Sequence, residues 1–190
     1  MAKKIILVTG GARSGKSLFA EQYATVKGKN IAYIATAQAY DQEMKERINL
    51  HRKRRPDNWY TYESPYNAES TVTEASKTCD TILFDCLTIY TSNLLLDPKA
   101  PSEREERYTY VMQAVSSFTE SIANCDSNVI IVTNEVGMGI VPENALAREY
   151  RDLAGAVNQK IAANADEVYL VVSGIPVNIK QLAVRLAKEE

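Results

Sequence analysis

The sequence predicts an α/β protein in which helices cover both faces of a mostly parallel β-sheet. First, short and nearly continuous apolar segments alternate with amphipathic segments along the chain. Strands that are buried on both faces and joined by helical crossovers have this pattern. Second, the first apolar segment leads into Gly10–Ser17, which fits G-x-x-x-x-G-K-S, and then into a helical pattern. This order of strand, glycine-rich turn and helix is typical of a phosphate-binding loop, so we expect a P-loop NTPase-like fold.

Apolar runs rich in Ile, Val, Leu and Tyr predict the strands Lys4–Thr9, Asn30–Thr36, Thr81–Asp85, Asn128–Thr133 and Glu167–Ser173. Helical periodicity predicts the helices Lys16–Val26, Asp41–Arg55, Ala68–Lys77, Ser102–Ala123 and Pro142–Ala163. Less regular segments that could add a short strand, an edge strand and a terminal helix are Trp59–Glu63, Val177–Ile179 and Leu182–Lys188. The proline-containing segment Leu96–Ser102 is more typical of a surface loop than of a domain boundary, so we expect a single domain over residues 1–190.

Length and composition exclude several classes of protein. A chain of 190 residues can bury a substantial core. Its net charge of −2 argues against a general nucleic-acid binder. The three cysteines include no C-x-x-C pair, which favours free thiols in a reducing compartment. No apolar run approaches the roughly 20 residues of a membrane span, and the segment before the glycine loop is too short for a signal peptide. We therefore expect a cytoplasmic protein without a membrane span.

The glycine-rich loop Gly10–Ser17 carries the first functional prediction. Its glycines let backbone N–H groups turn toward phosphate oxygens, and the following helix adds the partial positive charge of its N-terminus. Lys16 would reach the β- and γ-phosphates, and the Ser17 hydroxyl would bind Mg²⁺. The alternative is a glycine-rich turn that connects a strand to a helix and binds nothing.

The strand Thr81–Asp85 ends in a carboxylate. Ligands of open α/β sheets bind at the carboxyl ends of the strands, so Asp85 could hold Mg²⁺ together with Ser17, as a Walker B acid does. Alternatively, Asp85 could cap a following helix. The neighbouring strands end in Ala35-Thr36-Ala37 and Asn134-Glu135, which would lie at the same edge.

His51 is the only histidine of the chain and lies near the end of a predicted helix closed by Pro56. It is followed by a cluster of cations, Arg52, Lys53, Arg54 and Arg55. Cations at a helix C-terminus complement the helix dipole, and a histidine there can be an ordinary capping residue. Alternatively, neighbouring positive charge favours the neutral imidazole, which can attack phosphorus while arginines neutralise the phosphates. The residues alone leave both interpretations open.

A third segment, Val132–Asn144, contains Gly137, Gly139 and Pro142 between a predicted strand and a predicted helix. It could be a substrate lid, an oligomer contact or a tight turn with proline at the start of the helix. Its composition does not decide among the three.

Together these segments resemble the bifunctional adenosylcobinamide kinase / adenosylcobinamide-phosphate guanylyltransferases of cobalamin synthesis. The residues that carry the resemblance are Val8–Ser17, Tyr33–Ala37, Glu43-Met44, Arg47-Ile48, His51, Arg55-Pro56, Trp59, Thr133–Asn144, Arg151–Gly155, Val157–Gln159 and Val171–Ile175. The segment Leu96–Ser127 and the tail after Lys180 show no such likeness. Leu50 is apolar where some family members have a polar residue, and Asp85 stands where some have Glu.

The resemblance implies two reactions. The family phosphorylates the aminopropanol hydroxyl of adenosylcobinamide with ATP or GTP. It then transfers GMP from GTP to adenosylcobinamide phosphate through a histidine–GMP phosphoramidate and releases pyrophosphate. The family histidine corresponds to His51. The family's nucleotide contacts correspond to Gly10, Gly11, Ala12, Arg13, Ser14, Gly15, Lys16, Ser17, Ala35, Thr36, Ala37, Arg52, Lys53, Arg54, Arg55, Glu63 and Asp85. Family members assemble as trimers, which implies a homo-oligomer.

Three other functions are weighed against this one. The chain could be a P-loop small-molecule kinase of another pathway that uses the basic cluster only to clamp phosphate. It could also be an interaction module that changes conformation with nucleotide and transfers no group. Nucleic-acid binding through Arg52–Arg55 is disfavoured, because the patch is short, lacks interleaved aromatic residues and lies in an acidic protein.

Overall fold

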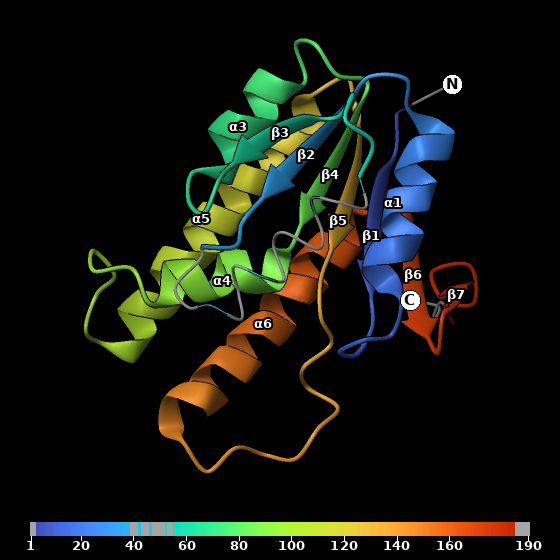
Figure 1. The fold of residues 1–190 in the computed structure, drawn as a ribbon. Coiled ribbons are helices and arrows are strands. Elements are labelled where there is room, and N and C mark those ends of the chain that lie inside the picture. The colour runs from blue at the N-terminus through green and yellow to red at the C-terminus, as the bar shows by residue number, and fades with distance from the viewer. Residues whose placement is uncertain (1–2, 39–41, 43–45, 47–51, 53–54, 185–190) are drawn as a thin grey trace, which may run out of the picture.

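The computed structural model describes residues 3–38, 42, 46, 52 and 55–184, and these form a sheet between two helical layers (Figure 1). The strands are β1 (Ile5–Thr9), β2 (Ile31–Ala35), β3 (Tyr60–Glu63), β4 (Thr81–Asp85), β5 (Asn128–Val132), β6 (Glu167–Val172) and β7 (Ile175–Asn178). Their order in the seven-stranded sheet is β3-β2-β4-β5-β1-β6-β7. All strand pairs are parallel except β6–β7, which is an antiparallel hairpin. The predicted α/β class is confirmed.

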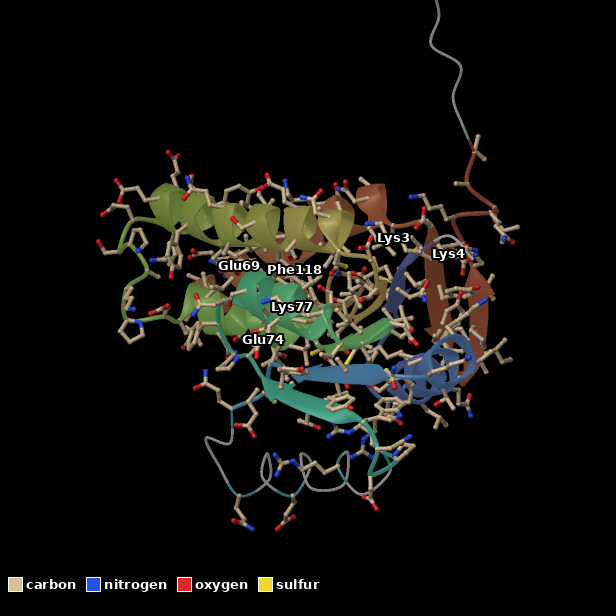
Figure 2. All side chains as sticks on the ribbon, turned by 90° about the horizontal axis from the view of Figure 1, so that it is seen from above. Lys3, Lys4, Glu69, Glu74, Lys77 and Phe118 are labelled. Atoms are coloured by element: carbon tan, nitrogen blue, oxygen red, sulfur yellow. The ribbon has the colours of Figure 1, made fainter. Side chains whose placement is uncertain are left out.

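The helices are α1 (Lys16–Lys27), α3 (Ala68–Ala75), α4 (Leu87–Leu95), α5 (Arg104–Asn124) and α6 (Ala145–Asn164). Because side chains alternate along a strand, β1 contributes Ile6 and Val8 to one core and Ile5 and Leu7 to the other. The first core lies under α1, and the second lies under α3, α4, α5 and α6. Phe118 lies on the side of α5 that faces the sheet (Figure 2) and packs against Phe84 of β4 with ring centroids 4.7 Å apart.

Helix α4 was not predicted from the sequence. Seven of its nine residues are buried, because α4 lies under α5 and α6 as well as beside the sheet. A helix that is buried on most sides shows no clear amphipathic pattern, so the signal used for the other helices was missing here.

The boundaries of other helices and strands differ from the predicted ones by a few residues. Helix α6 begins at Ala145 and not at Pro142, because Asn144 is its N-cap and accepts a hydrogen bond from the Ala147 N–H at 3.0 Å. The predicted strands at Trp59–Glu63 and Val177–Ile179 are confirmed as β3 and β7, with β7 beginning two residues earlier.

Two predicted helices lie partly or largely outside the described residues. Within Asp41–Arg55, the described residues Gln42, Glu46 and Arg52 are helical, and Arg55 lies in a bend. Within Leu182–Lys188, the described residues 182–184 are not helical. Among the described residues, no helix is long and apolar enough to cross a membrane.

Two lysines satisfy the C-terminal carbonyl groups of long helices. The Lys3 ammonium donates to the carbonyls of Ala123 and Cys125 at the end of α5, at 2.6 and 2.5 Å. The Lys180 ammonium does the same at the end of α6, where it contacts the carbonyls of Ala162, Ala163 and Ala165. A cation at this position offsets the partial negative charge of the helix C-terminus. Lys180 thereby fixes the chain that follows β7 against α6.

Replacing Lys180 with methionine retains most of the aliphatic stem and removes the three donors. We expect Lys180→Met to lower the free energy of unfolding by about 1 kcal/mol, because the carbonyls of α6 lose a charged partner. Urea denaturation measures this change. Lys99→Met, at an exposed lysine in the loop between α4 and α5, is the control. Equal midpoints for the two variants would contradict the capping role.

Candidate active site

The glycine-rich loop Gly10–Ser17 connects β1 to α1 at the carboxyl edge of the parallel strands. Two of its glycines are required by close contacts. A Cβ atom on Gly10 would collide with the Val171 carbonyl oxygen and lie 2.7 Å from Ser14 Oγ. Gly15 has a φ of 94°, and a Cβ atom there would lie 3.1 Å from the Gly174 Cα atom. The loop can therefore take this path only with glycine at both positions.

Backbone hydrogen bonds hold the loop from two sides. The Glu135 N–H donates to the Gly10 carbonyl at 3.1 Å, and the Gly174 N–H donates to the Ser14 carbonyl at 2.8 Å. Ser173 and Gly174 have φ values of 51° and 82° and form the two-residue turn of the β6–β7 hairpin, as a type I′ turn requires. This support was not predicted from the sequence, although a Ser-Gly pair between two apolar runs is a recognisable turn signal.

The first turn of α1 has the features of an anion site. Its N-cap is Gly15, no side chain caps it, and no acidic residue lies in its first turn. The N–H groups of a helix start without a side-chain cap can bind an anion. Lys16 is only 8% exposed, and its ammonium donates to the Gly11 carbonyl at 3.1 Å. The structure thus places the Lys16 cation beside the loop, as the sequence predicts, and Ser17 follows it in the same turn.

Asp85 lies at the end of β4 and pairs in register with Ala35 of β2 and Val132 of β5. The N-cap residue of α4 is Cys86, which makes no side-chain capping hydrogen bond, so Asp85 is not the N-cap residue of this helix. The Tyr33 hydroxyl donates to Asp85 Oδ2 at 3.2 Å.

Burial and the Asp85 carboxylate alter the acidity of two neighbours. Burial, followed by the Asp85 charge, raises the pKa of Tyr33 far above its ordinary value. The same two causes raise the pKa of Cys86 to about 11. The Tyr33 hydroxyl therefore stays protonated and can donate to Asp85, and the Cys86 thiol is not a nucleophile near neutral pH.

Thr36 follows β2 at the expected edge of the sheet, and its polar groups are engaged within the protein. It is fully buried, and its hydroxyl donates to the Cys86 carbonyl at 2.9 Å and accepts from the Cys86 N–H at 2.8 Å. Its own carbonyl accepts from Asn93 of α4 at 2.8 Å, and its N–H donates to the Asp85 carbonyl at 3.3 Å. Each polar group of Thr36 is thus engaged within the protein. It joins the ends of β2 and β4 to α4, while Ala35 and Ala37 on either side are half-buried.

The basic segment is described at Arg52 and Arg55. His51, Lys53 and Arg54, which were also predicted for the site, lie outside the described residues. Arg52 forms an ion pair of 3.0 Å with Glu63 at the end of β3. The Arg55 guanidinium lies 3.5 Å from the centroid of the Tyr33 ring. Arg52 thus contacts the carboxyl end of β3, and Arg55 contacts the Tyr33 ring of β2, whose hydroxyl reaches Asp85.

Hydrogen bonds of Thr133 and Asn134 anchor the beginning of the segment that follows β5. The Thr133 hydroxyl donates to Asn158 Oδ1 at 2.7 Å and lies 3.2 Å from the Thr88 hydroxyl, which accepts from the Asn134 N–H at 2.7 Å. Asn158 in turn donates to the Asn134 carbonyl at 3.2 Å. This network joins β5 to α4 and α6 at the site.

Between Asn134 and the beginning of α6, the chain is largely exposed. Met138 and Ile140 are 82% and 95% exposed, and α6 begins only at Ala145. The tight-turn alternative for this segment is therefore wrong, because the chain forms an extended loop with apolar side chains in solvent. A substrate lid and an oligomer contact both agree with this geometry.

Comparisons with known proteins agree with the geometry. The family model described as cobinamide kinase / cobinamide phosphate guanyltransferase matches residues 6–179. The chain is 45% identical over 181 residues to the bifunctional adenosylcobalamin biosynthesis protein CobU of Escherichia coli, covering 93% of this chain and 99% of that protein. It is 41% identical over 177 residues to the bifunctional adenosylcobalamin biosynthesis protein CobP of Pseudomonas aeruginosa, covering 92% and 96%.

A solved structure supports the fold class alone. An ATPase of a bacterial type III secretion system superposes with a TM-score of 0.56 at 12% identity, covering 96% of this chain and 59% of that chain. The fold class thus agrees with a P-loop ATPase, while the family is decided by the match over residues 6–179 and by the relatives of similar length. The chain belongs to the cobinamide kinase / cobinamide phosphate guanyltransferase family.

Proposed function

We propose that this chain phosphorylates adenosylcobinamide with ATP or GTP and then transfers GMP from GTP to adenosylcobinamide phosphate, with release of pyrophosphate. The observation that carries the proposal is a buried lysine and an uncapped helix start at the carboxyl edge of the sheet, in a chain whose family model spans residues 6–179. CobU of Escherichia coli, which covers nearly the same length, is named as bifunctional.

In the kinase step, the backbone of Gly10–Ser17 binds the phosphates and Lys16 neutralises the charge that develops on the γ-phosphoryl group. The corrinoid hydroxyl attacks the γ-phosphorus, the bond to the nucleoside diphosphate breaks, and the hydroxyl proton leaves to solvent or a base. Positioning and charge neutralisation are sufficient for this transfer, because no covalent enzyme intermediate is needed.

Mg²⁺ would be held by Ser17 and Asp85. Hydroxyl and carboxylate oxygens are ligands that Mg²⁺ prefers, and the ion commonly takes few protein ligands and completes its shell with phosphate oxygens and water. Among the described residues, no group of three or more His, Cys, Asp or Glu could hold a metal. When bound, the ion neutralises phosphate charge.

In the guanylyl step, His51 acts as the nucleophile. A neutral imidazole nitrogen attacks the α-phosphorus of GTP, a P–N bond forms, and pyrophosphate leaves. The phosphate of adenosylcobinamide phosphate then attacks the same phosphorus, and the P–N bond breaks to restore His51. Cations of the Arg52–Arg55 cluster neutralise the charge on the phosphates. The contacts of Arg52 with Glu63 and of Arg55 with Tyr33 support this role, since they bring the cluster to the nucleotide edge of the sheet.

We further propose that the chain works as a single-domain subunit of a cytoplasmic homotrimer. The exposed apolar side chains of Met138, Ile140 and Val141 agree with an oligomer contact. The three cysteines are free and buried, which agrees with a reducing compartment.

Removing the imidazole separates the two reactions. We expect His51→Ala to retain kinase activity within about threefold and to lose guanylyl transfer by more than about 10³-fold, because only the second step needs the nucleophile. Rates of corrinoid phosphorylation and of GMP transfer measure the two steps. Gln42→Ala, in the same predicted helix, is the control. Normal GMP transfer by His51→Ala would exclude His51 as the nucleophile.

The covalent intermediate can be detected directly. Incubation with α-labelled GTP is expected to label the wild-type protein and not His51→Ala, and the label should be acid-labile and base-stable, as a phosphoramidate is. ATP-dependent phosphorylation without any labelled protein would favour a small-molecule kinase of another pathway. Nucleotide binding without transfer of any group would favour an interaction module.

Lys16 serves both reactions in this scheme. We expect Lys16→Ala to lower the rates of both steps by about 10²-fold or more, because both nucleotides bind in the same phosphate loop. Lys27→Ala, at the far end of the same helix, is the control and should change neither rate by more than about twofold. If Lys16→Ala lost one step and retained the other, the two reactions would use separate nucleotide sites.

A further inference from the structure

Tyr33 lies between Asp85, the predicted metal ligand, and Arg55 of the predicted basic cluster. It was not itself predicted as a site residue. Its hydroxyl donates to Asp85 Oδ2 at 3.2 Å, and its ring is covered by the Arg55 guanidinium at 3.5 Å from the ring centroid. The ring itself is held firmly, because Tyr33 is only 5% exposed and packs in the core under α1.

The strand register explains how one side chain reaches both partners. Tyr33 of β2 pairs with Leu83 of β4, and Asp85 lies two residues beyond Leu83 on the same face. A diagonal neighbour of this kind is within reach of an aromatic side chain. Phenylalanine would fill the same core space, so packing alone does not require the hydroxyl. The contact with Asp85 does require it.

Each contact restricts a flexible group. A hydrogen bond to one oxygen of a carboxylate limits its rotation, and a bond to a charged acceptor is stronger than a neutral one. A guanidinium stacked on an aromatic face retains its charge while its plane is fixed. The cation of Arg55 and the carboxylate of Asp85 are thereby held relative to the same rigid ring.

We propose that Tyr33 is a positioning residue that orients Asp85 for Mg²⁺ and Arg55 for the phosphates. The proposal rests on the proposed function, since it needs Asp85 to bind the metal. It extends that function by joining the metal-binding end of β4 to the basic segment that follows His51. One buried side chain thus serves both reactions without touching either substrate.

The test of the Asp85 contact is Tyr33→Phe, which retains the ring and removes the hydroxyl. We expect the Mg²⁺ concentration at half-saturation to rise about tenfold, measured by titrating Mg²⁺ into the protein with a non-hydrolysable GTP analogue. Binding of the analogue in EDTA should change by less than about twofold, because the phosphate loop is intact. The matched control is Tyr110→Phe, which removes a similar hydrogen bond of 3.1 Å between Tyr110 and Asp97, away from the strand ends.

The test of the Arg55 contact is Tyr33→Leu, which also removes the aromatic face. At saturating Mg²⁺ we expect formation of the labelled GMP–protein adduct to fall about tenfold below that of Tyr33→Phe. Thermal unfolding of both variants confirms that they are folded.

Two results would overturn the proposal, and Asp85→Asn distinguishes them. If Asp85→Asn weakens the response to Mg²⁺ but Tyr33→Phe behaves as Tyr110→Phe does, Asp85 binds the metal without the help of Tyr33. If Asp85→Asn responds to Mg²⁺ as the wild type does, the metal role of Asp85 in the proposed function fails and the role of Tyr33 fails with it. Equal adduct formation by Tyr33→Leu and Tyr33→Phe would overturn the Arg55 contact alone.

Discussion

The parallel pairing of β1 with β5 on one side and with β6 on the other is the interaction on which the site depends. Residues Ile5–Val8 pair with Val129–Val132, and Ile6–Thr9 pair with Glu167–Leu170. This register continues beyond the strands, where Gly10 accepts from Glu135 and Ser14 accepts from Gly174. The phosphate loop is therefore shaped by the chain on both sides of it as well as by its own glycines. A preorganised set of N–H groups of this kind needs little rearrangement when it binds an anion.

Much of the fold could be predicted from the sequence, because five of the strands are nearly continuous apolar runs and the phosphate loop has a specific motif. Helix α4 could not, since burial on most sides removes the periodic pattern by which a surface helix is recognised. The beginning of α6 was placed too early because a proline at position 142 is typical of a helix start, whereas Asn144 provides the cap that is observed.

The site could be predicted only where a residue type is tied to its chemistry by local sequence. Lys16 and Asp85 follow from motifs, and both lie at the expected edge of the sheet. The contacts of Thr36 with Cys86 and Asn93 join residues 50 and 57 positions apart, and no local pattern indicates such pairs. Tyr33 resembles any other buried strand residue until its register with β4 is known. Such contacts depend on which strands become neighbours in the sheet, and local sequence patterns do not show this.

The lysine caps on α5 and α6 have a consequence for the whole molecule. The connection between two parallel strands must return to the opposite edge of the sheet, so α1, α3, α5 and α6 run against the strands, and α1 has its N-terminus at the phosphate loop. The dipoles of these helices place partial positive charge toward that edge, in a chain whose net charge is −2. Lys3 and Lys180 neutralise the opposite ends of two of these helices. A negatively charged ligand would be attracted to this partial positive charge, and the attraction would weaken as ionic strength rises.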